Sequence, residues 1–152
     1  MSVKEADIDE LLALLDQGRQ AWIDGQLGYG RGYDAEQDED MTIFGPFGGE
    51  ALRGTAQLAG RQDRAASLFG GGEGRCDLVK TIISGDVVVV IQVERNEARV
   101  QGARAPQPWV LRTTQVFERR DGQWVRLHRH ADPLIDLRTP EQTFAIARGA
   151  DF

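Results

Sequence analysis

The sequence predicts an α+β fold in which three N-terminal helices pack on a curved antiparallel sheet of four to six strands. Apolar residues recur at helical spacing in the first part of the chain. From residue 75 onward the chain changes to β-branched runs, separated by turn signals such as Asp121-Gly122. Helices followed by a strand meander are typical of a sheet that is covered on one face.

Three helices are expected before residue 70. Residues 4–24 form an amphipathic pattern, with apolar side chains at Ile8, Leu11, Leu12, Leu15, Trp22 and Ile23. Residues 26–40 predict a short, imperfect helix, because three glycines weaken its pattern. Residues 55–69 predict the third helix, and residues 140–148 a short terminal one.

The strands are predicted by β-branched runs and by the turns between them. They are expected at residues 41–44, 75–84, 86–95, 108–119 and 123–131. Ser84-Gly85-Asp86 and Asp121-Gly122 supply two tight hairpin turns. The glycine-rich residues 70–74 predict a flexible loop, and residues 96–107 a polar one.

Length and composition limit the class of protein. The 152 residues predict one domain, 1–152, and 41% hydrophobic with 28% charged residues is typical of a soluble globular protein. No apolar run is long enough to cross a membrane, and the first residues lack the apolar core of a secretion signal, so a cytoplasmic location is expected. A net charge of −6 argues against nucleic acid as a partner. The single cysteine, Cys76, excludes an intrachain disulfide and is interpreted as a packing residue.

The segment 111–130 carries a family resemblance. It combines a strand bearing Arg112 and threonines, a basic hairpin with Asp121-Gly122 at its turn, Trp124, and the pair His128 and His130. This resembles the closing hairpin of SnoaL-like proteins, of the nuclear transport factor 2-like superfamily, and of the calcium/calmodulin-dependent kinase II association domain. The resemblance implies a cone-shaped fold around one pocket. It does not specify a function, because this fold hosts isomerases, cyclases, dehydratases and non-catalytic assembly modules.

Ketosteroid isomerase is the enzyme of this superfamily that offers the most direct comparison. The resemblance places its general base, an aspartate before a proline, at Gly45 ahead of Pro46. Its oxyanion tyrosine would fall in the first helix, where this chain has Arg19, Gln20 and Trp22. Isomerase chemistry is therefore not transferred to this chain.

The candidate catalytic residues lie at the end of the chain's last expected strand. On a regular strand His128, His130 and Asp132 share a face with Trp124 and Arg126. A histidine could move a proton near neutral pH, and Asp132 could orient it. The alternative interpretation is that one histidine satisfies hydrogen bonds of the sheet or of a dimer and the other lies at the rim.

Arg112, in the preceding strand, is the candidate for stabilising developing negative charge, or else a surface arginine paired with an acid. His128, His130 and Asp132 are spread too far along the strand for all three to bind one ion. Neither a metal nor a cofactor is expected. The hairpin arginines Arg119, Arg120, Arg126 and Arg129 are expected on a solvated or subunit-contacting surface.

The candidate ligand-binding residues are mostly aromatic, although aromatic residues at such positions more often belong to a core. They are Trp22, Tyr33, Phe44, Phe47, Trp109 and Gln115. The first functional hypothesis is a small-molecule pocket protein of the SnoaL-like type, with cofactor-free acid/base chemistry of an isomerase, cyclase or dehydratase on a modest apolar substrate. The alternative is a non-catalytic ligand-binding or oligomerisation module whose pocket arginines bind an acidic group.

A homodimer is expected under either hypothesis. Residues 87–91 are apolar on both strand faces, as is much of 107–117. Helices on one face of a sheet leave the other face uncovered, and twofold pairing with a second copy is the common way to bury it.

Overall fold

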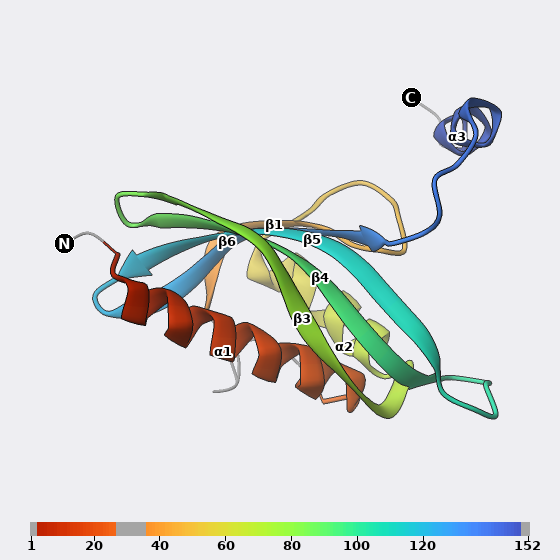
Figure 1. Cartoon of the computed structure of the whole chain (residues 1–152), viewed down its shortest axis with the longest axis horizontal. Coiled ribbons are helices and arrows are strands. Elements are labelled where there is room, and N and C mark those ends of the chain that lie inside the picture. The colour runs from red at the N-terminus through yellow and green to blue at the C-terminus, as the bar shows by residue number, and fades with distance from the viewer. Residues whose placement is uncertain (1–2, 27–35, 150–152) are drawn as a thin grey trace.

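The computed structural model describes residues 3–26 and 36–149. The elements in chain order are α1 (Glu5–Ile23), β1 (Glu36–Phe44), β2 (Leu52–Arg53), α2 (Thr55–Ala66), β3 (Phe69–Ser84), β4 (Val87–Val100), β5 (Gln107–Arg120), β6 (Gln123–Pro133) and α3 (Pro140–Ala147). The predicted α+β class is confirmed, with six strands in one curved sheet (Figure 1).

The strand order across the sheet is β2-β1-β6-β5-β4-β3. Strands β3 to β6 form the expected antiparallel meander. The sheet is nevertheless mixed, because β1 pairs with β6 in parallel. These two strands are far apart in the chain, so no hairpin turn forces them to run in opposite directions.

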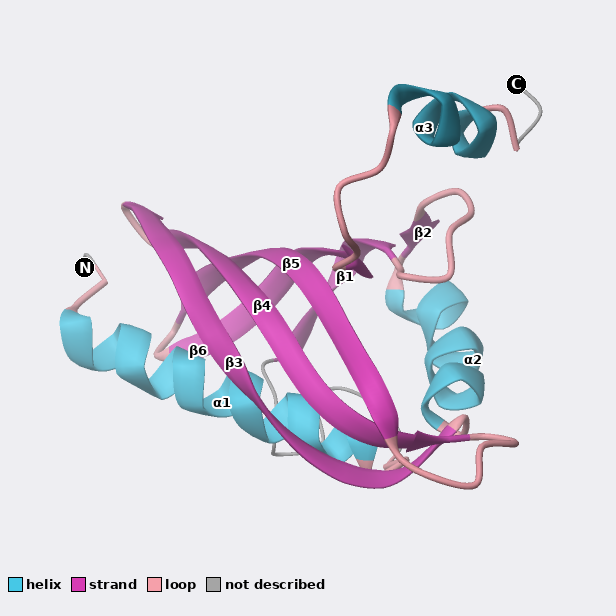
Figure 2. Cartoon of the chain, turned by 45° about the vertical axis from the view of Figure 1, so that its right-hand side comes forward, coloured by secondary structure: helices cyan, strands magenta, loops and turns pink. Residues whose placement is uncertain are grey.

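Two helices cover the concave face of the sheet (Figure 2). Helix α1 packs against β3 and β4, and α2 packs against β1 and β2. The helix expected over 26–40 is not observed where the chain is described, since residues 36–40 belong to β1. Gln26 is described and follows the turn after α1. The other residues of this expected helix, 27–35, which include Tyr33, lie outside the described residues. None of the described helices is long and apolar enough to cross a membrane.

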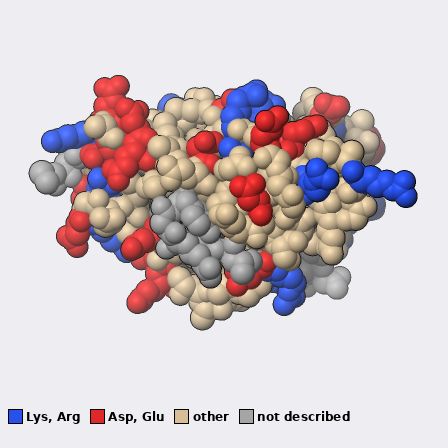
Figure 3. All heavy atoms as spheres, turned by 90° about the horizontal axis from the view of Figure 1, so that it is seen from below, with Lys and Arg blue, Asp and Glu red and all other residues tan. Residues whose placement is uncertain are grey.

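Helix α1 is held on the sheet by a stripe of apolar side chains, and acidic residues stabilise its N-terminal end. Ile8, Leu11 and Leu15 are buried against a cluster of sheet residues that includes Phe117 and Trp124. Figure 3 shows acidic side chains gathered at the end of the molecule where α1 begins, the end at which the helix dipole favours negative charge.

Helix α3 is the terminal helix that the sequence predicts, but it packs on nothing that the structure describes. Figures 1 and 2 both show it standing away from the sheet at the end of an extended segment. None of its residues is buried, and Phe144 and Ile146 are exposed. Its first turn is closed locally by Thr139, whose side chain accepts a hydrogen bond from the backbone of Gln142.

The glycine-rich residues 70–74 are not the flexible loop that was expected. They belong to β3, where Gly72 pairs with Ala98 and Gly74 with Asn96. A Cβ atom at Gly74 would contact the backbone oxygen of Arg95 and would lie 2.9 Å from Nη1 of Arg19. Glycine is required there by close approach, because a guanidinium group from α1 crosses the strand at this point.

A β-bulge in β6 sets the direction of every later side chain in that strand. Val116 of β5 pairs with His128, whereas the next residue, Phe117, pairs with Arg126. Leu127 is therefore an extra residue without a partner in β5. One extra residue exchanges the two faces, so the expectation that His128 shares a face with Arg126 is wrong.

We expect Gly74→Ala to lower the free energy of unfolding by about 1–3 kcal/mol, because the added methyl group must displace Arg19 or the neighbouring strand. Gly60 provides the control, since it lies in α2 with nothing within 4 Å of an added Cβ. Gly60→Ala is expected to raise the free energy of unfolding by about 0.5–1 kcal/mol. Urea denaturation measures both, and effects of the same sign would contradict this role of Gly74.

Candidate functional site

A cavity of about 130 Å³ lies between α1, α2 and the concave face of the sheet. The turn after β1 contributes its rim, including Gly45 and Phe47. An added Cβ at Gly45 would meet nothing within 4 Å. The position that resembles the isomerase's general base is thus a glycine with open space beside it.

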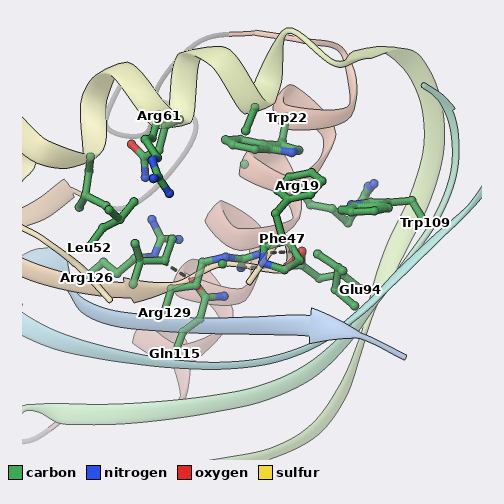
Figure 4. Close-up of a pocket in the computed structure, with 18 of the residues that line it drawn as sticks. Arg19, Trp22, Phe47, Leu52, Arg61, Glu94, Trp109, Gln115, Arg126 and Arg129 are labelled. Carbon is green, nitrogen blue, oxygen red and sulfur yellow. Dashed lines mark hydrogen bonds and ion pairs between the residues drawn. The ribbon is translucent and has the colours of Figure 1, made fainter. Parts of the chain in front are cut away.

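Aromatic side chains form one wall of the cavity. Trp22 comes from α1, Trp109 from β5, and Phe47 from the turn after β1 (Figure 4). The rings of Phe47 and Trp109 stack, with centroids 5.7 Å apart and planes inclined by 28°. Trp109 also packs against Phe69, at 5.3 Å between centroids, which fixes it from the other side.

Four of the six predicted ligand-binding residues line this cavity: Trp22, Phe47, Trp109 and Gln115. Phe44 does not line it, because its side chain lies on the other face of β1, against the rings of His128 and His130. Tyr33 lies outside the described residues.

The floor of the cavity is polar and buried. Arg126, of which 1% is exposed, donates from Nε to Oε1 of Gln115 at 2.9 Å. Its guanidinium group also lies over the ring of Phe117, 5.2 Å from the centroid. These contacts hold the side chain in one orientation, with a positive charge at the wall of an apolar space.

A second arginine of β6 forms a two-pronged ion pair across the sheet. Both terminal nitrogens of Arg129 donate to the carboxylate of Glu94 in β4, at 3.0 Å each. The two side chains are about nine-tenths buried. Such a pair is stable when its geometry is good and costs much when one partner is removed.

A third buried arginine links α1 to the sheet. Arg19 donates from Nη1 to Oδ1 of Asn96 at 2.8 Å and from Nε to Asp16 at 3.0 Å. Asn96 in turn donates to the backbone oxygen of Trp109 at 3.0 Å. The network therefore ties the helix to the strand that carries an aromatic wall residue.

The four candidate catalytic residues lie on the convex face, away from this cavity. Nδ1 of His128 and the hydroxyl of Thr42 share a hydrogen bond of 2.7 Å. Arg112 donates to both oxygens of Asp132 at 2.8 Å, and with His130 these two residues border a separate groove. Asp132 is thus engaged by arginine, and the structure gives it no contact that orients a histidine.

The electrostatics of the convex face follow from these contacts. Partial burial lowers the pKa of His128, and the nearby His130 lowers it further. The hydrogen bonds from Arg112 hold the pKa of Asp132 below its usual range. At neutral pH His128 is therefore uncharged and Asp132 is ionised.

Arg126 and Arg129 were expected on a solvated or subunit-contacting surface, and the structure corrects this. Both point inward, because the bulge at Leu127 lies between them. A signal was present in β4, whose buried positions change from valines to Gln92, Glu94 and Asn96. A run of polar residues at inward-facing positions indicates a polar floor that needs inward-facing partners.

Arg120 does lie at the surface, but the side chain of Arg119 is only 19% exposed and its guanidinium group lies over the ring of Trp124. Arg119 pairs with Glu10 of α1 at 3.0 Å, and Arg120 with Asp38 at 2.7 Å. Cys76 is partly buried, and burial together with the charge of Glu94 raises the pKa of its thiol to about 12. The thiol is therefore protonated at neutral pH and is not a nucleophile.

We expect Glu94→Gln to lower the free energy of unfolding by about 3–5 kcal/mol, because it puts a neutral amide beside the buried guanidinium group of Arg129. Asp132→Asn is the matched control, since it breaks an exposed pair and is expected to cost less than about 1 kcal/mol. Urea denaturation at constant pH gives both values. A cost for Glu94→Gln as small as that of the control would show that the pair does not stabilise the cavity floor.

Solved structures show the same fold. A nuclear transport factor 2-like superfamily protein from Salmonella enterica serovar Typhimurium is 17% identical, with a TM-score of 0.66 over 88% of this chain and 94% of that one. The CaMKII hub of S. rosetta is 17% identical, with a TM-score of 0.62 over 83% and 95%. A protein of the NTF2-like family from Streptomyces avermitilis is 19% identical, with a TM-score of 0.53. The match covers 62% of this chain and 66% of that protein.

No curated protein matches the chain. The family model of the SnoaL-like domain matches residues 30–136, which is more than half of the sequence. This range includes the sheet from β1 to β6 and the turn at Gly45, and thus most of the cavity wall. The chain belongs to the SnoaL-like domain family, and it shares its fold with a nuclear transport factor 2-like superfamily protein.

Proposed function

We propose that this protein is a small-molecule-binding domain whose ligand occupies the cavity between α1, α2 and the sheet. The observation that carries the proposal is the combination of an aromatic wall with a buried, hydrogen-bonded polar floor. Concave sites with a few fixed polar groups are typical of ligand pockets. An engineered cavity of about 150 Å³ binds benzene, so about 130 Å³ suits a ligand of roughly one ring.

Binding without catalysis is favoured over acid/base chemistry in this cavity. No histidine lines it among the residues that the structure describes. Of the two carboxylates among the described lining residues, Glu94 has both oxygens engaged by Arg129, and Glu50 is exposed at the rim. An enzyme that used His130 and Arg112 would have to hold its substrate in the convex groove instead.

We expect Phe47→Ala to weaken ligand binding without lowering stability, because Phe47 stacks on Trp109 at the cavity mouth and is itself 62% exposed. Phe44→Ala is the matched control, since Phe44 is also an exposed phenylalanine but lies on the opposite face. A thermal-shift screen of single-ring aromatic compounds supplies the probe. The measurement is the dissociation constant of the best compound, with a loss of about tenfold expected for Phe47→Ala only.

Native mass spectrometry of the protein as purified from cells tests the same proposal independently. A retained small molecule that is lost in Phe47→Ala and kept in Phe44→Ala would support binding in the cavity. Equal effects of the two substitutions on every compound would contradict it.

We further propose that the convex face of the sheet pairs with a second copy of the chain. Val79 and Ile82 of β3 are 65% and 45% exposed, and Ile91, Val93 and Val116 continue the apolar surface. No described helix covers this face. The likeness in fold to a protein described as a hub supports self-association.

We expect Ile82→Glu to convert a dimer, of two 16.8 kDa chains, into a monomer. Adjacent strand residues point to opposite faces, so Ile83→Glu is a control of the same chemistry and similar exposure. Sedimentation equilibrium at micromolar concentration measures the mass. A monomeric unsubstituted protein, or equal dissociation by both substitutions, would contradict the assignment of the interface to the convex face.

A further inference from the structure

We infer that the ligand is an aromatic molecule of about one ring that carries an uncharged carbonyl group, and that Gln62 of α2 donates a hydrogen bond to this carbonyl oxygen. The inference rests on the proposed binding function of the cavity, and it adds the chemical class of the ligand and the residue that recognises it. Three observations carry it: the position of Gln62 on α2, the unsatisfied amide of its side chain, and the aromatic wall of the same cavity.

Gln62 occupies a buried position on the face of α2 that lines the cavity. Four residues of this helix line the cavity and recur at helical spacing along one face: Leu58, Arg61, Gln62 and Ala65. The buried residues of α2 are Leu58, Gln62 and Ala66. Gln62 thus lies between two buried apolar residues, at a position where the amphipathic pattern of the helix calls for an apolar side chain.

The side-chain amide of Gln62 is buried and lacks a hydrogen bond. Only 8% of the residue is exposed, and its Nε2 has no hydrogen-bond partner among the described residues. An unsatisfied buried donor lowers stability, so packing alone would favour a leucine at this position. An acceptor that a ligand brings into the cavity would satisfy this donor, and the bound state would then be stabilised by a hydrogen bond that the free protein lacks.

The buried charges of the cavity wall have contacts within the protein. Arg129 pairs with Glu94, Arg19 pairs with Asp16, and Arg126 is held by side chains of the sheet. The unsatisfied amide needs an acceptor rather than a charge. Burying a carboxylate would cost more than one hydrogen bond from a neutral donor returns, so an uncharged oxygen is the better match.

The remainder of the cavity determines the rest of the ligand. Trp22, Phe47 and Trp109 form its aromatic wall, and Leu52 and Leu58 also line it. The volume of about 130 Å³ limits the ligand to about one ring. A carbonyl carbon attached directly to the ring keeps the molecule small and flat, and a flat molecule can pack closely against aromatic side chains.

Acetophenone and α-methylstyrene provide the test, because they have nearly the same shape and differ in whether an oxygen or a methylene group is attached to the side-chain carbon. Isothermal titration calorimetry on the full chain gives the dissociation constant of each. Since α-methylstyrene is the more hydrophobic compound, the ratio of the two constants is compared between the unsubstituted protein and Gln62→Leu. The substitution is expected to weaken the binding of acetophenone relative to α-methylstyrene by about fivefold.

Gln57→Leu is the matched control. It is the same substitution on the same helix, at an exposed position that does not line the cavity, and it should leave the ratio unchanged. The melting temperature of Gln62→Leu should be unchanged or higher, because the substitution removes an unsatisfied buried amide. Weaker binding of acetophenone by this variant is then separated from any loss of folded protein.

The side-chain amide signal of Gln62 in a ¹H–¹⁵N spectrum of the unsubstituted protein gives a second measurement, which holds even if Gln62→Leu does not fold. It should shift further with acetophenone than with α-methylstyrene, since only the ketone accepts a hydrogen bond. Equal shifts with the two compounds would overturn the role of Gln62.

A ratio that Gln62→Leu leaves unchanged would overturn the role of Gln62 and the carbonyl class, and the proposed binding function would stand because both compounds still bind. Failure of both compounds, together with every other single-ring aromatic probe, would overturn both. Benzoate that binds more tightly than acetophenone, and loses as much affinity in Gln62→Leu, would show that the amide recognises an anion and would overturn the uncharged class.

Discussion

The extra residue at Leu127 is the local feature on which the chemistry of both sheet faces depends. Without it, alternation along β6 would send Arg126 and His128 to one face and Arg129 to the other. With it, two arginines three positions apart both enter the concave side, and the histidines move to the convex side. A bulge costs a ladder hydrogen bond locally, and here it doubles the positive charge that one strand brings to the cavity.

Two charged side chains on a small concave face require compensation, and the neighbouring strands provide it. The carboxylate of Glu94 in β4 neutralises the charge of Arg129. The side-chain oxygen of Gln115 in β5 accepts a hydrogen bond from Nε of Arg126. The buried polar residues of three adjacent strands thus form one layer beneath the cavity, with apolar clusters on either side. Single residues of such a layer are difficult to substitute, because each one that is removed leaves a buried polar group without its partner.

The periodicity of the sequence and its turn signals predicted the main elements of this fold. The local irregularities of the strands could not be predicted in this way. The hairpin of β5 and β6 follows from Asp121-Gly122, whose positive φ angles of 48° and 76° suit its tight turn. The cavity aromatics Trp22 and Trp109 were also identified from the sequence. The bulge has no comparable signature, since a single leucine is compatible with both registers. For the same reason the sequence did not show that His130 and Arg126 lie on opposite faces of the sheet. It also did not show that the β3 glycines pair with the neighbouring strand.

The two faces of the sheet differ in their chemistry because the helices cover only one of them. Helices α1 and α2 occupy the concave side, so a ligand there is enclosed, and fixed polar groups act on it in a low dielectric. The convex side has apolar strand residues and uncharged His128, with Arg112 and Asp132 neutralising each other. A face with much exposed apolar area suits contact with another protein surface better than it suits capture of a small polar molecule. The same bulge that concentrates charge in the cavity thereby removes it from the surface where a second copy would pack.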